Sequence, residues 1–315
     1  MDPSIIAISI LHYKDALITS RCIDSLLSLQ IPNGWDLKII VVDNNSANGS
    51  FELLKAKYKT NVTKYIASKQ NLGFAQGNNL GFNYAKKILN ADIAIFLNND
   101  IEILQNDFIN KTIALLQDSD IDVLSPDVCA PQVCWHQSPL CDGSNIDAYI
   151  ESIVEENRAK LTQKQQRSPV FIIKTMISNL LINFNWYINY LIKKQRNKNI
   201  SEDWKHSRSD IVPQGACVIL ASNFIKNMDY VFYPETFMYF EECILKIICD
   251  AHGFKTYYSS DIQVLHHHKP ITKDSMRSKS KQQEIKTAIL TLDSYKILMD
   301  LKNALSTSSF GQVDQ

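Results

Sequence analysis

Apolar runs and amphipathic stretches alternate along the first hundred residues. Runs rich in Ile, Val, Phe and Leu without helical spacing predict buried strands at residues 5–11, 37–42, 62–67 and 91–97. Between them, apolar residues recur at helical spacing and predict helices at 16–29, 51–58 and 74–89. Because strands and helices alternate, we expect an α/β fold with a mostly parallel central sheet flanked by helices.

The alternation stops near residue 129 and resumes at residue 211. Residues 146–166 predict a polar helix in the interval. The later pattern predicts a strand at 215–221, a helix at 241–251 that ends at Gly253, a strand at 256–265, a helix at 279–305 and a frayed tail from 306. We therefore divide the chain into an α/β half (1–127), a largely helical insertion (128–209), a second half of the same domain (210–270) and a C-terminal helix with its tail (271–315).

Residues 171–192 are rich in aliphatic and aromatic side chains and are followed by the basic run 193–198. The stretch is almost long enough to cross a membrane, but Lys174 and several asparagines argue against a span. An apolar face with a basic end suits peripheral contact with an anionic membrane surface. The same face suits a helix packed over the site or in a homodimer contact, and this packing interpretation is preferred.

Composition narrows the function class. Lys plus Arg equals Asp plus Glu at 33 each, so no overall field favours nucleic acid as a partner. The N-terminal residues lack the features of a signal peptide, and seven scattered cysteines suit reduced thiols, so we expect a cytoplasmic protein. Cys129, Cys134, Cys141 and His136 are close in sequence but lack the paired spacing of a zinc module, so free cysteines are preferred.

The strand at 91–97 ends in Asn98, Asn99 and Asp100. In open α/β sheets, ligands bind at the carboxyl ends of strands. A carboxylate there can hold a hard divalent cation, and the cation can hold a diphosphate. Asn and Asp also favour turns, so this segment alone is equally compatible with an Asx-type turn.

Tyr13 and Asp43 follow the first two predicted strands directly. An aspartate there can accept a hydrogen bond from a base or a ribose hydroxyl, and an aromatic ring can stack on the base. The alternatives are a helix N-cap for Asp43 and a core position for Tyr13. Glycines at 73, 77 and 81 permit close approach of the backbone to a ligand or to another element, but the stretch is neither a Walker loop nor a dinucleotide fingerprint.

Two further groups lie in the second half. Glu241 and Glu242 begin a predicted helix, where the helix dipole stabilises a carboxylate anion that could act as a base; a solvated helix start is the alternative. Three histidines follow the strand at 256–265, and alternation places His266 and His268 on one face and His267 on the other. One of them could complete a metal site with Asp100, or all three could be exposed.

Taken in order, these segments resemble the inverting family 2 glycosyltransferases with the GT-A fold, especially the branch that includes bacterial rhamnosyltransferases. The matching segments are residues 41–46, 71–79, 96–100, 214–217 and 237–242, followed by His266. The resemblance covers residues 4–270 with a poorly matched middle. No single segment is specific, but six in the right order are hard to obtain by chance.

The resemblance implies a role for each matching position. Asp43 looks like the residue that reads the base, Asp100 like the acid of a DXD-type metal motif, and His266 like a distal metal or diphosphate ligand. Glu242 matches the carboxylate that activates the acceptor, with Glu241 as a neighbour that could take that role. Gly215 and Ala216 match a tight acceptor-side segment. The implied nucleotide-sugar pocket comprises His12, Tyr13, Asp43, Asn71, Gly73, Asn78, Asn98 and Asn99.

One departure concerns the predicted helix at 241–251. Family members often read Glu-Asp-x-Asp-Leu there, whereas residues 241–245 read Glu-Glu-Cys-Ile-Leu. Ile244 replaces the second acid and Ile247 stands where an Arg often follows, which puts support for the base or the diphosphate from this helix in doubt. Glu242 itself is retained.

The implied activity is transfer of a sugar, with inversion, from a nucleotide-diphosphate sugar to a saccharide or lipid-linked saccharide acceptor. Mg²⁺ or Mn²⁺ is the implied cofactor, and bacterial surface polysaccharide synthesis at the inner face of the cell membrane is the implied setting. Two other classes are considered. A sugar nucleotidyltransferase would want a Gly-rich segment after the first strand, and residues 12–15 contain no glycine. A non-catalytic nucleotide-sugar-binding module is suggested by Ile244.

Overall fold

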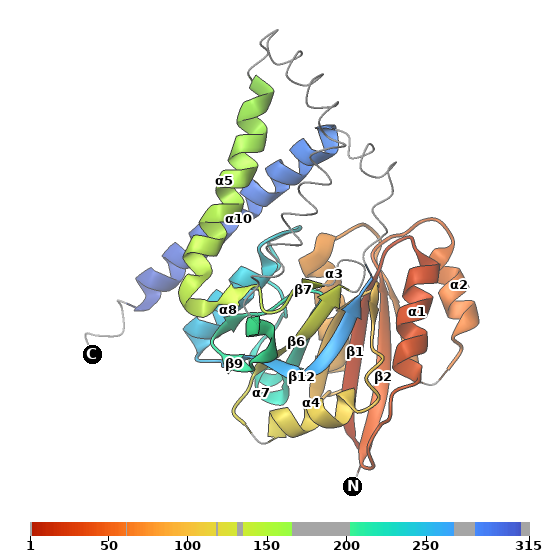
Figure 1. Ribbon diagram of the computed structural model, residues 1–315. Helices are drawn as coiled ribbons and strands as arrows, with labels where there is room; N and C mark the ends of the chain where they lie inside the picture. The colour runs from red at the N-terminus through yellow and green to blue at the C-terminus, as the bar shows by residue number, and fades with distance from the viewer. Residues whose placement is uncertain are drawn as a thin grey trace.

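A ten-stranded mixed sheet runs through the protein, with helices on both faces (Figure 1). The computed structural model describes residues 2–60, 62–117, 119–130, 135–165, 202–267 and 281–309, and every structural statement below refers to these ranges. The strand order is β3-β2-β1-β4-β11-β6-β12-β5, with β7 beside β6 and β9 beside β12. A separate two-stranded sheet joins β10 to β8.

The strands are β1 (Ser4–His12), β2 (Trp35–Asp43), β3 (Thr63–Ala67), β4 (Ile93–Asn98), β5 (Ile101–Glu102), β6 (Val123–Ala130), β7 (Trp135–His136), β8 (Cys141–Asp142), β9 (Arg208–Ser209), β10 (Ile211–Val212), β11 (Cys217–Ala221) and β12 (Thr256–His266). The α-helices are α1 (Ala16–Leu27), α2 (Ser50–Lys57), α3 (Gly73–Lys87), α4 (Phe108–Gln117), α5 (Ile146–Gln165), α7 (Ser222–Asn227), α8 (Glu241–His252) and α10 (Lys281–Ser309). Two short 3₁₀ helices are η1 (Gly143–Asn145) and η2 (Glu202–Lys205).

The first half of the sheet is parallel, as the alternating pattern predicts. Strands β3, β2, β1 and β4 are neighbours and all run the same way. Helices α1, α2 and α3 connect them in sequence. The carboxyl ends of these strands therefore meet at one edge, where Asp43 lies beside His12 in register. This edge is where α/β proteins bind ligands.

The second half of the sheet also contains antiparallel strand pairs. β11 runs antiparallel to both β4 and β6, whereas β12 is parallel to β6 and antiparallel to β5. The reversal places the beginning of β11 beside the end of β4, with Cys217 opposite Leu97. The segment before β11, which includes Gly215, therefore lies at the same sheet edge as Asn98 and Asp100.

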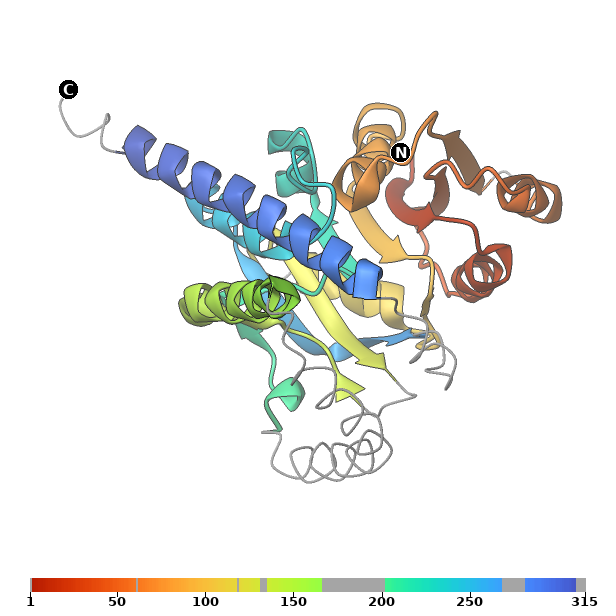
Figure 2. The ribbon, with the colours of Figure 1, turned by 90° about the horizontal axis from the view of Figure 1, so that it is seen from above.

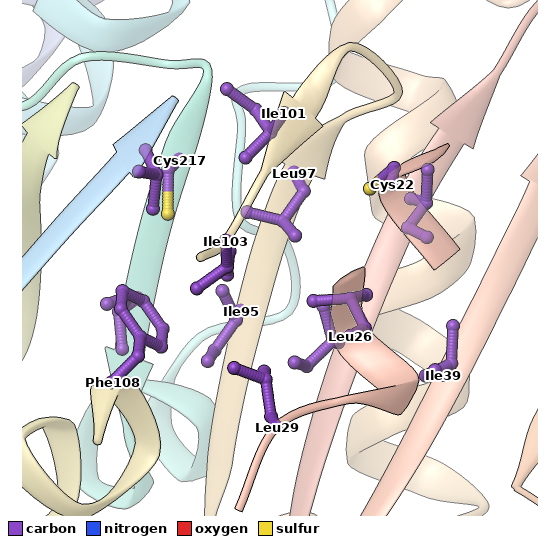
Figure 3. Packing of buried hydrophobic residues seen from close by; sticks show 14 of the residues in the cluster. Cys22, Leu26, Leu29, Ile39, Ile95, Leu97, Ile101, Ile103, Phe108 and Cys217 are labelled. Carbon is purple, nitrogen blue, oxygen red and sulfur yellow. The ribbon is translucent and has the colours of Figure 1, made fainter. Parts of the chain in front are cut away.

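Side chains of each strand alternate between two apolar layers. On β4, Ile93, Ile95 and Leu97 face one layer, while Ala94 and Phe96 face the other. Figure 3 shows the first layer, in which Cys22, Leu26 and Leu29 pack over Ile95 and Ile39. The second layer contains apolar side chains of α3, α5, α7, α8 and α10. Full burial of one Leu or Ile contributes about 1.5–3 kcal/mol, so these layers are the main source of stability.

The C-terminal helix α10 crosses α5 and packs against it on one side of the sheet (Figures 1 and 2). Lys302 pairs with Asp147 at 2.6 Å, and the guanidinium of Arg158 lies 6.0 Å from the Tyr295 ring centroid. The helix continues to Ser309, so the tail predicted from residue 306 is wrong for its first residues. Hydroxyls of Ser306 and Thr307 bond to carbonyls of the preceding turn, which satisfies these polar side chains within the helix.

Several other predictions have clear outcomes. The polar helix predicted at 146–166 is confirmed as α5, whereas α4 and β6 were not predicted. The apolar stretch 171–192, the basic run 193–198, Cys134 and His268 lie outside the described residues. Within the described ranges, no helix is both long and apolar enough to cross a membrane.

Candidate active site

His12 lies beneath the predicted nucleotide pocket. Its side chain is fully buried, with Nδ1 2.7 Å from Thr19 Oγ1 and Nε2 2.9 Å from Ser50 Oγ. The Thr19 hydroxyl donates to the carbonyl of Asp15, so Nδ1–H donates to Thr19 and Nε2 accepts from Ser50. Burial lowers the pKa of His12, against the opposing charges of Asp43 and Asp15. Because both ring nitrogens are engaged by protein, the His12 side chain supports the pocket from beneath in this structure, and its contact with the nucleotide stays a prediction.

Asp43 closes a turn at the end of β2. Its carboxylate accepts hydrogen bonds from the backbone N–H of Ser46 at 3.2 Å and from the Ser46 hydroxyl. The N-cap of α2 is Gly49, so the N-cap alternative for Asp43 is excluded. A carboxylate offers about four lone-pair sites, and the Ser46 bonds leave acceptor capacity for a base or ribose.

Tyr13 lies at the mouth of the same edge, 41% exposed, so it is not a core residue. The ammonium of Lys14 is 4.8 Å from its ring centroid. Hydrogen bonding from Lys14 is the main cause that lowers the pKa of Tyr13, and Asn71 and Lys286 of α10 act in the same direction. Lys286 therefore brings the C-terminal helix close to the predicted nucleotide pocket.

The loop before α3 is bound to the protein's own backbone. Asn71 Oδ1 accepts from Gly73 N at 2.9 Å and from Asn44 Nδ2 at 3.1 Å. Gly73 has a φ of +76°, and a Cβ there would lie 2.1 Å from the carbonyl oxygen of Phe237. Phe74 N donates to that same carbonyl at 2.7 Å. Asn71 and Gly73 thus build the loop and join it to the segment before α8, and their direct contact with the nucleotide sugar stays a prediction.

The remaining glycines of this stretch serve close packing of α3 on the sheet. A Cβ at Gly77 would lie 2.7 Å from Leu11, and one at Gly81 would lie 2.0 Å from Ser9 Oγ. Asn78 is buried in α3 and donates to the carbonyl of Phe74 four residues earlier. Of the two possibilities for these glycines, packing against another element is the one the structure uses.

Asp100 and His266 meet after a separation of 166 residues. His266 Nε2 lies 3.2 Å from Asp100 Oδ1, and the backbone N–H of His267 donates to the Asp100 carbonyl at 2.8 Å. Gln137 Oε1 lies 2.8 Å from His266 Nδ1, which assigns the proton to Nδ1 and turns the lone pair of Nε2 toward Asp100. A carboxylate and an imidazole side by side are a donor set that suits Mn²⁺. No group of three metal-binding side chains occurs in the described ranges, so these two would bind the cation together with ligand oxygens.

The two asparagines before Asp100 differ in role. The backbone N–H of Asn98 donates to Ala216 at 3.0 Å, which joins the end of β4 to the segment before β11. The Asn99 amide instead donates to Thr19 Oγ1 at 3.0 Å, beneath His12. The Asn99 amide is thus turned toward α1, and the contact of Asn99 with the nucleotide sugar stays a prediction. The side chain of His267 pairs with Glu102 and is not part of the Asp100–His266 pair.

Glu242 and Gly215 lie in direct contact. A Cβ at Gly215 would lie 2.3 Å from Glu242 Oε1, so only glycine leaves room for this carboxylate. Burial raises the pKa of Glu242, while backbone N–H groups, including that of Gly215, act in the opposite direction. The carboxylate lies close to Tyr149 of α5, where burial and then the charge of Glu242 raise the pKa of the phenol. A base with a raised pKa can accept a proton more readily near neutral pH.

Glu241 is more deeply buried, at 3% exposure, and its Oε1 has no hydrogen-bond partner. Burial, followed by the charge of Glu242, raises its pKa to about 8. The expectation that the helix dipole holds an anion here is wrong, because loss of hydration outweighs the dipole. The solvated-start alternative is also excluded. Two consecutive residues with positive φ, Tyr239 (80°) and Phe240 (64°), turn the chain into this helix and mark local backbone strain.

Ile244 is fully buried in the apolar layer beneath α8. An acid at this position would lose its hydration. The isoleucine is therefore a packing residue of this chain, and it leaves Glu242 in place.

The family model for glycosyl transferase family 2 matches residues 8–178, which is more than half of the chain. The chain belongs to glycosyl transferase family 2. A curated relative, the low-salt glycan biosynthesis hexosyltransferase Agl10 of Haloferax volcanii, is 29% identical over 108 residues, which are 34% of this chain and 34% of the relative. Only about a third of that relative is therefore matched.

Solved structures show that this family 2 chain has the GT-A fold. S. aureus TarS 1-349 aligns with a TM-score of 0.51 at 11% identity, over 83% of this chain and 60% of that one. The mannosyltransferase PcManGT of Pyrobaculum calidifontis, in complex with GDP-Man and Mn²⁺, aligns with a TM-score of 0.50 at 10% identity, over 90% of this chain and 64% of that one. At this identity the likeness concerns the fold alone.

Three amides of this family 2 chain were missed from the sequence. Gln137 positions His266, as described above. Asn44 accepts from Leu72 N at 2.8 Å and donates to Gly73 O at 2.9 Å. Asn79 bonds the backbone of Phe232 through both amide atoms. Of the three, only Asn79 could have been predicted from the sequence. Its spacing from Ala75 and Phe82 places it on the apolar face of α3, and a buried amide needs hydrogen-bond partners.

Proposed function

We propose that the protein transfers a sugar, with inversion, from a nucleotide-diphosphate sugar to a hydroxyl of a saccharide or lipid-linked saccharide. The main support for this proposal is that the carboxylates of Asp100 and Glu242 belong to segments that lie at the same edge of the sheet. The Asn98–Ala216 hydrogen bond joins the strand that leads to Asp100 with the segment that holds Glu242 in place. Membership of family 2 and the relative named as a hexosyltransferase support the class of reaction.

Tyr13 and Asp43 would hold the nucleotide at the ends of β1 and β2. Tyr13 offers an exposed ring for stacking, and Asp43 offers acceptor oxygens to the base or ribose. A related fold binds GDP-Man together with Mn²⁺, and TarS binds UDP. These two proteins bind different nucleotides, so the nucleotide of this protein is to be determined by experiment.

Asp100 and His266 would hold Mg²⁺ or Mn²⁺, and the bound cation would neutralise charge on the departing diphosphate. Glu242 would accept the proton of the acceptor hydroxyl as the oxygen attacks the anomeric carbon. Such a base contributes about 10²–10⁴-fold to a rate. With the base on one side of the sugar and the diphosphate on the other, a single displacement inverts the anomeric configuration.

A donor panel tests this proposal. The protein is incubated with UDP-, GDP- and dTDP-sugars and Mn²⁺, and release of nucleoside diphosphate is measured with and without EDTA. We expect slow, EDTA-sensitive release from one donor, lost in D100N. Glu242→Gln should abolish transfer to acceptor while the donor still binds with nearly unchanged affinity. Release from no donor, or full transfer by E242Q, would contradict the proposal.

A further inference from the structure

A second polar cluster lies at the end of β6, apart from the groups assigned above. The Asp127 side chain is only 1% exposed, and its carboxylate accepts from His136 Nδ1 at 2.8 Å and from Gln263 Nε2 at 2.7 Å. The Asp127 contact assigns the His136 proton to Nδ1, so Nε2 presents its lone pair. In the described part of the chain, no hydrogen bond to His136 Nε2 is present.

The imidazole of His136 stacks flat on the indole of Trp204. Their ring centroids are 3.6 Å apart and their planes differ by 7°. The backbone at Trp204 is held by the buried Tyr258, whose hydroxyl donates to the Trp204 carbonyl at 2.6 Å. Both stacked rings keep partial contact with solvent. We call these two rings the His136–Trp204 stack.

This arrangement offers more than packing requires. A buried carboxylate that orients an imidazole gives little net stability compared with apolar residues of similar size. Aromatic faces combined with a few oriented polar atoms are instead typical of small-molecule binding sites. The stack provides an aromatic face, the indole of Trp204, and an oriented polar atom, His136 Nε2.

The stack also lies next to the proposed reaction centre. His136 and Gln137 are consecutive, and their side chains point in opposite directions. His136 contacts Asp127, whereas Gln137 contacts His266, which is paired with Asp100. Asp127 shares its face of β6 with Val123, which packs in the same apolar layer as Ile244 of α8. The helix that carries Glu242 and the stack therefore lie on one side of the sheet.

We propose that the His136–Trp204 stack is an acceptor subsite that binds a pyranose ring. The C–H face of the ring would pack on the aromatic surface, and a ring hydroxyl would donate to His136 Nε2. Asp127 is then a positioning residue that keeps the accepting tautomer of His136. This inference rests on the proposed glycosyl transfer and assigns its acceptor to the saccharides.

Tryptophan fluorescence tests the subsite directly. The chain has four tryptophans, and emission is titrated with methyl glycosides of glucose, galactose, mannose and N-acetylglucosamine. We expect a saturable change with at least one glycoside, lost in W204F and retained in the control W35F, whose tryptophan begins β2. His136→Ala should weaken that binding about tenfold, which corresponds to about 1.4 kcal/mol. Unchanged emission with all four glycosides, or a change that persists in W204F, would overturn the subsite.

Donor hydrolysis without acceptor separates this inference from the proposed function. Release of nucleoside diphosphate, with Mn²⁺ present, should be the same for wild type, W204F and H136A, and their melting temperatures should agree within a few degrees. If wild type hydrolyses no nucleotide sugar, the transferase proposal fails, while the glycoside titration still decides whether the stack binds saccharide. If H136A alone loses hydrolysis while keeping its melting temperature, the stack belongs to the donor site and the acceptor assignment is wrong.

Discussion

The carboxylate of Glu242 occupies the space that any side chain at Gly215 would need. A Cβ on Gly215 would lie 2.3 Å from Glu242 Oε1, 3.0 Å from Cδ and 3.1 Å from Cγ. The atoms in the way form the free end of a flexible side chain, so they can move without disturbing the backbone. A larger residue at position 215 should therefore displace the Glu242 carboxylate without disturbing the core. The effect of the carboxylate's position on activity can then be measured in a folded protein.

We accordingly expect Gly215→Ala to fold normally and to lose transfer. Displacing a base by about 1 Å costs about 10²-fold in rate. Donor binding, measured by titration with the nucleoside diphosphate and Mn²⁺, should stay near the wild-type value. Gly34→Ala is a contrasting control: a Cβ there meets nothing within 4 Å, but the φ of +84° strains any residue other than glycine, so we expect G34A to lose stability and to keep transfer. Retained transfer in G215A would show that Glu242 is not the base.

The sequence predicts the backbone of this site better than its side-chain contacts. Asp100 was placed at the end of a buried strand by the apolar run before it, and His266 by the run at 256–265. Both positions follow from strand ends, which a pattern of apolar residues marks well. Their 3.2 Å contact depends on the antiparallel pairing of β5 with β12, which sets Ile101 opposite His266 and which the apolar pattern does not predict.

His12 and Asn99 show what the pattern leaves open. Both follow apolar runs at the correct edge, yet both side chains turn inward to the hydroxyl of Thr19. A residue at a strand end can face the ligand or the helix beneath it, and the choice depends on a partner located elsewhere in the chain. Thr19 lies within a helical pattern and gives no sign in the sequence that it accepts two hydrogen bonds.

Replacing Gln137 with Leu should weaken the metal site without removing a ligand. Gln137 Oε1 holds His266 in the tautomer that turns Nε2 toward Asp100, and loss of such a supporting bond lowers metal affinity about 10–100-fold. We expect the Mn²⁺ concentration needed for half-maximal donor hydrolysis to rise by that factor, with the rate recovered at saturating Mn²⁺. Manganese-dependent activity is the measurement.

Gln105→Leu is the matched control for that experiment. Its amide also bonds the backbone of β12, at Gln263 and Asp261, but it does not contact His266. We expect its manganese dependence to equal that of wild type. An equal shift in both variants would mean that Gln137 acts only by stabilising β12.

Glu241 should make folding stability fall as the pH rises. Burial raises the pKa of Glu241 to about 8, above its value in the unfolded chain, so the folded state binds more protons between these two values. Stability is then lost with rising pH across that window, by up to about 1.4 kcal/mol per pH unit. In E241Q this contribution is absent, so the variant should be more stable than wild type near pH 8 and nearly equal to it near pH 4. Urea unfolding at several pH values measures the difference.

Transfer by E241Q distinguishes the two adjacent carboxylates. A neutral amide resembles the protonated acid that the buried site favours, so we expect E241Q to keep most of the wild-type transfer near pH 7, in contrast to E242Q. Loss of transfer by E241Q with normal donor binding would mean that Glu241 is itself the base, and the assignment of Glu242 would have to be abandoned.

Ser50→Ala tests whether His12 supports the pocket rather than contacting the ligand. The substitution removes the donor to His12 Nε2 and leaves a fully buried nitrogen without a partner, at a cost of about 1–3 kcal/mol. Ser152→Ala, at an exposed serine of α5, should be nearly neutral by comparison. Nucleotide affinity, measured below the melting temperature of both variants, should change less than about twofold, which corresponds to about 0.4 kcal/mol. A large loss of nucleotide affinity in S50A without a loss of stability would instead place His12 in direct contact with the nucleotide.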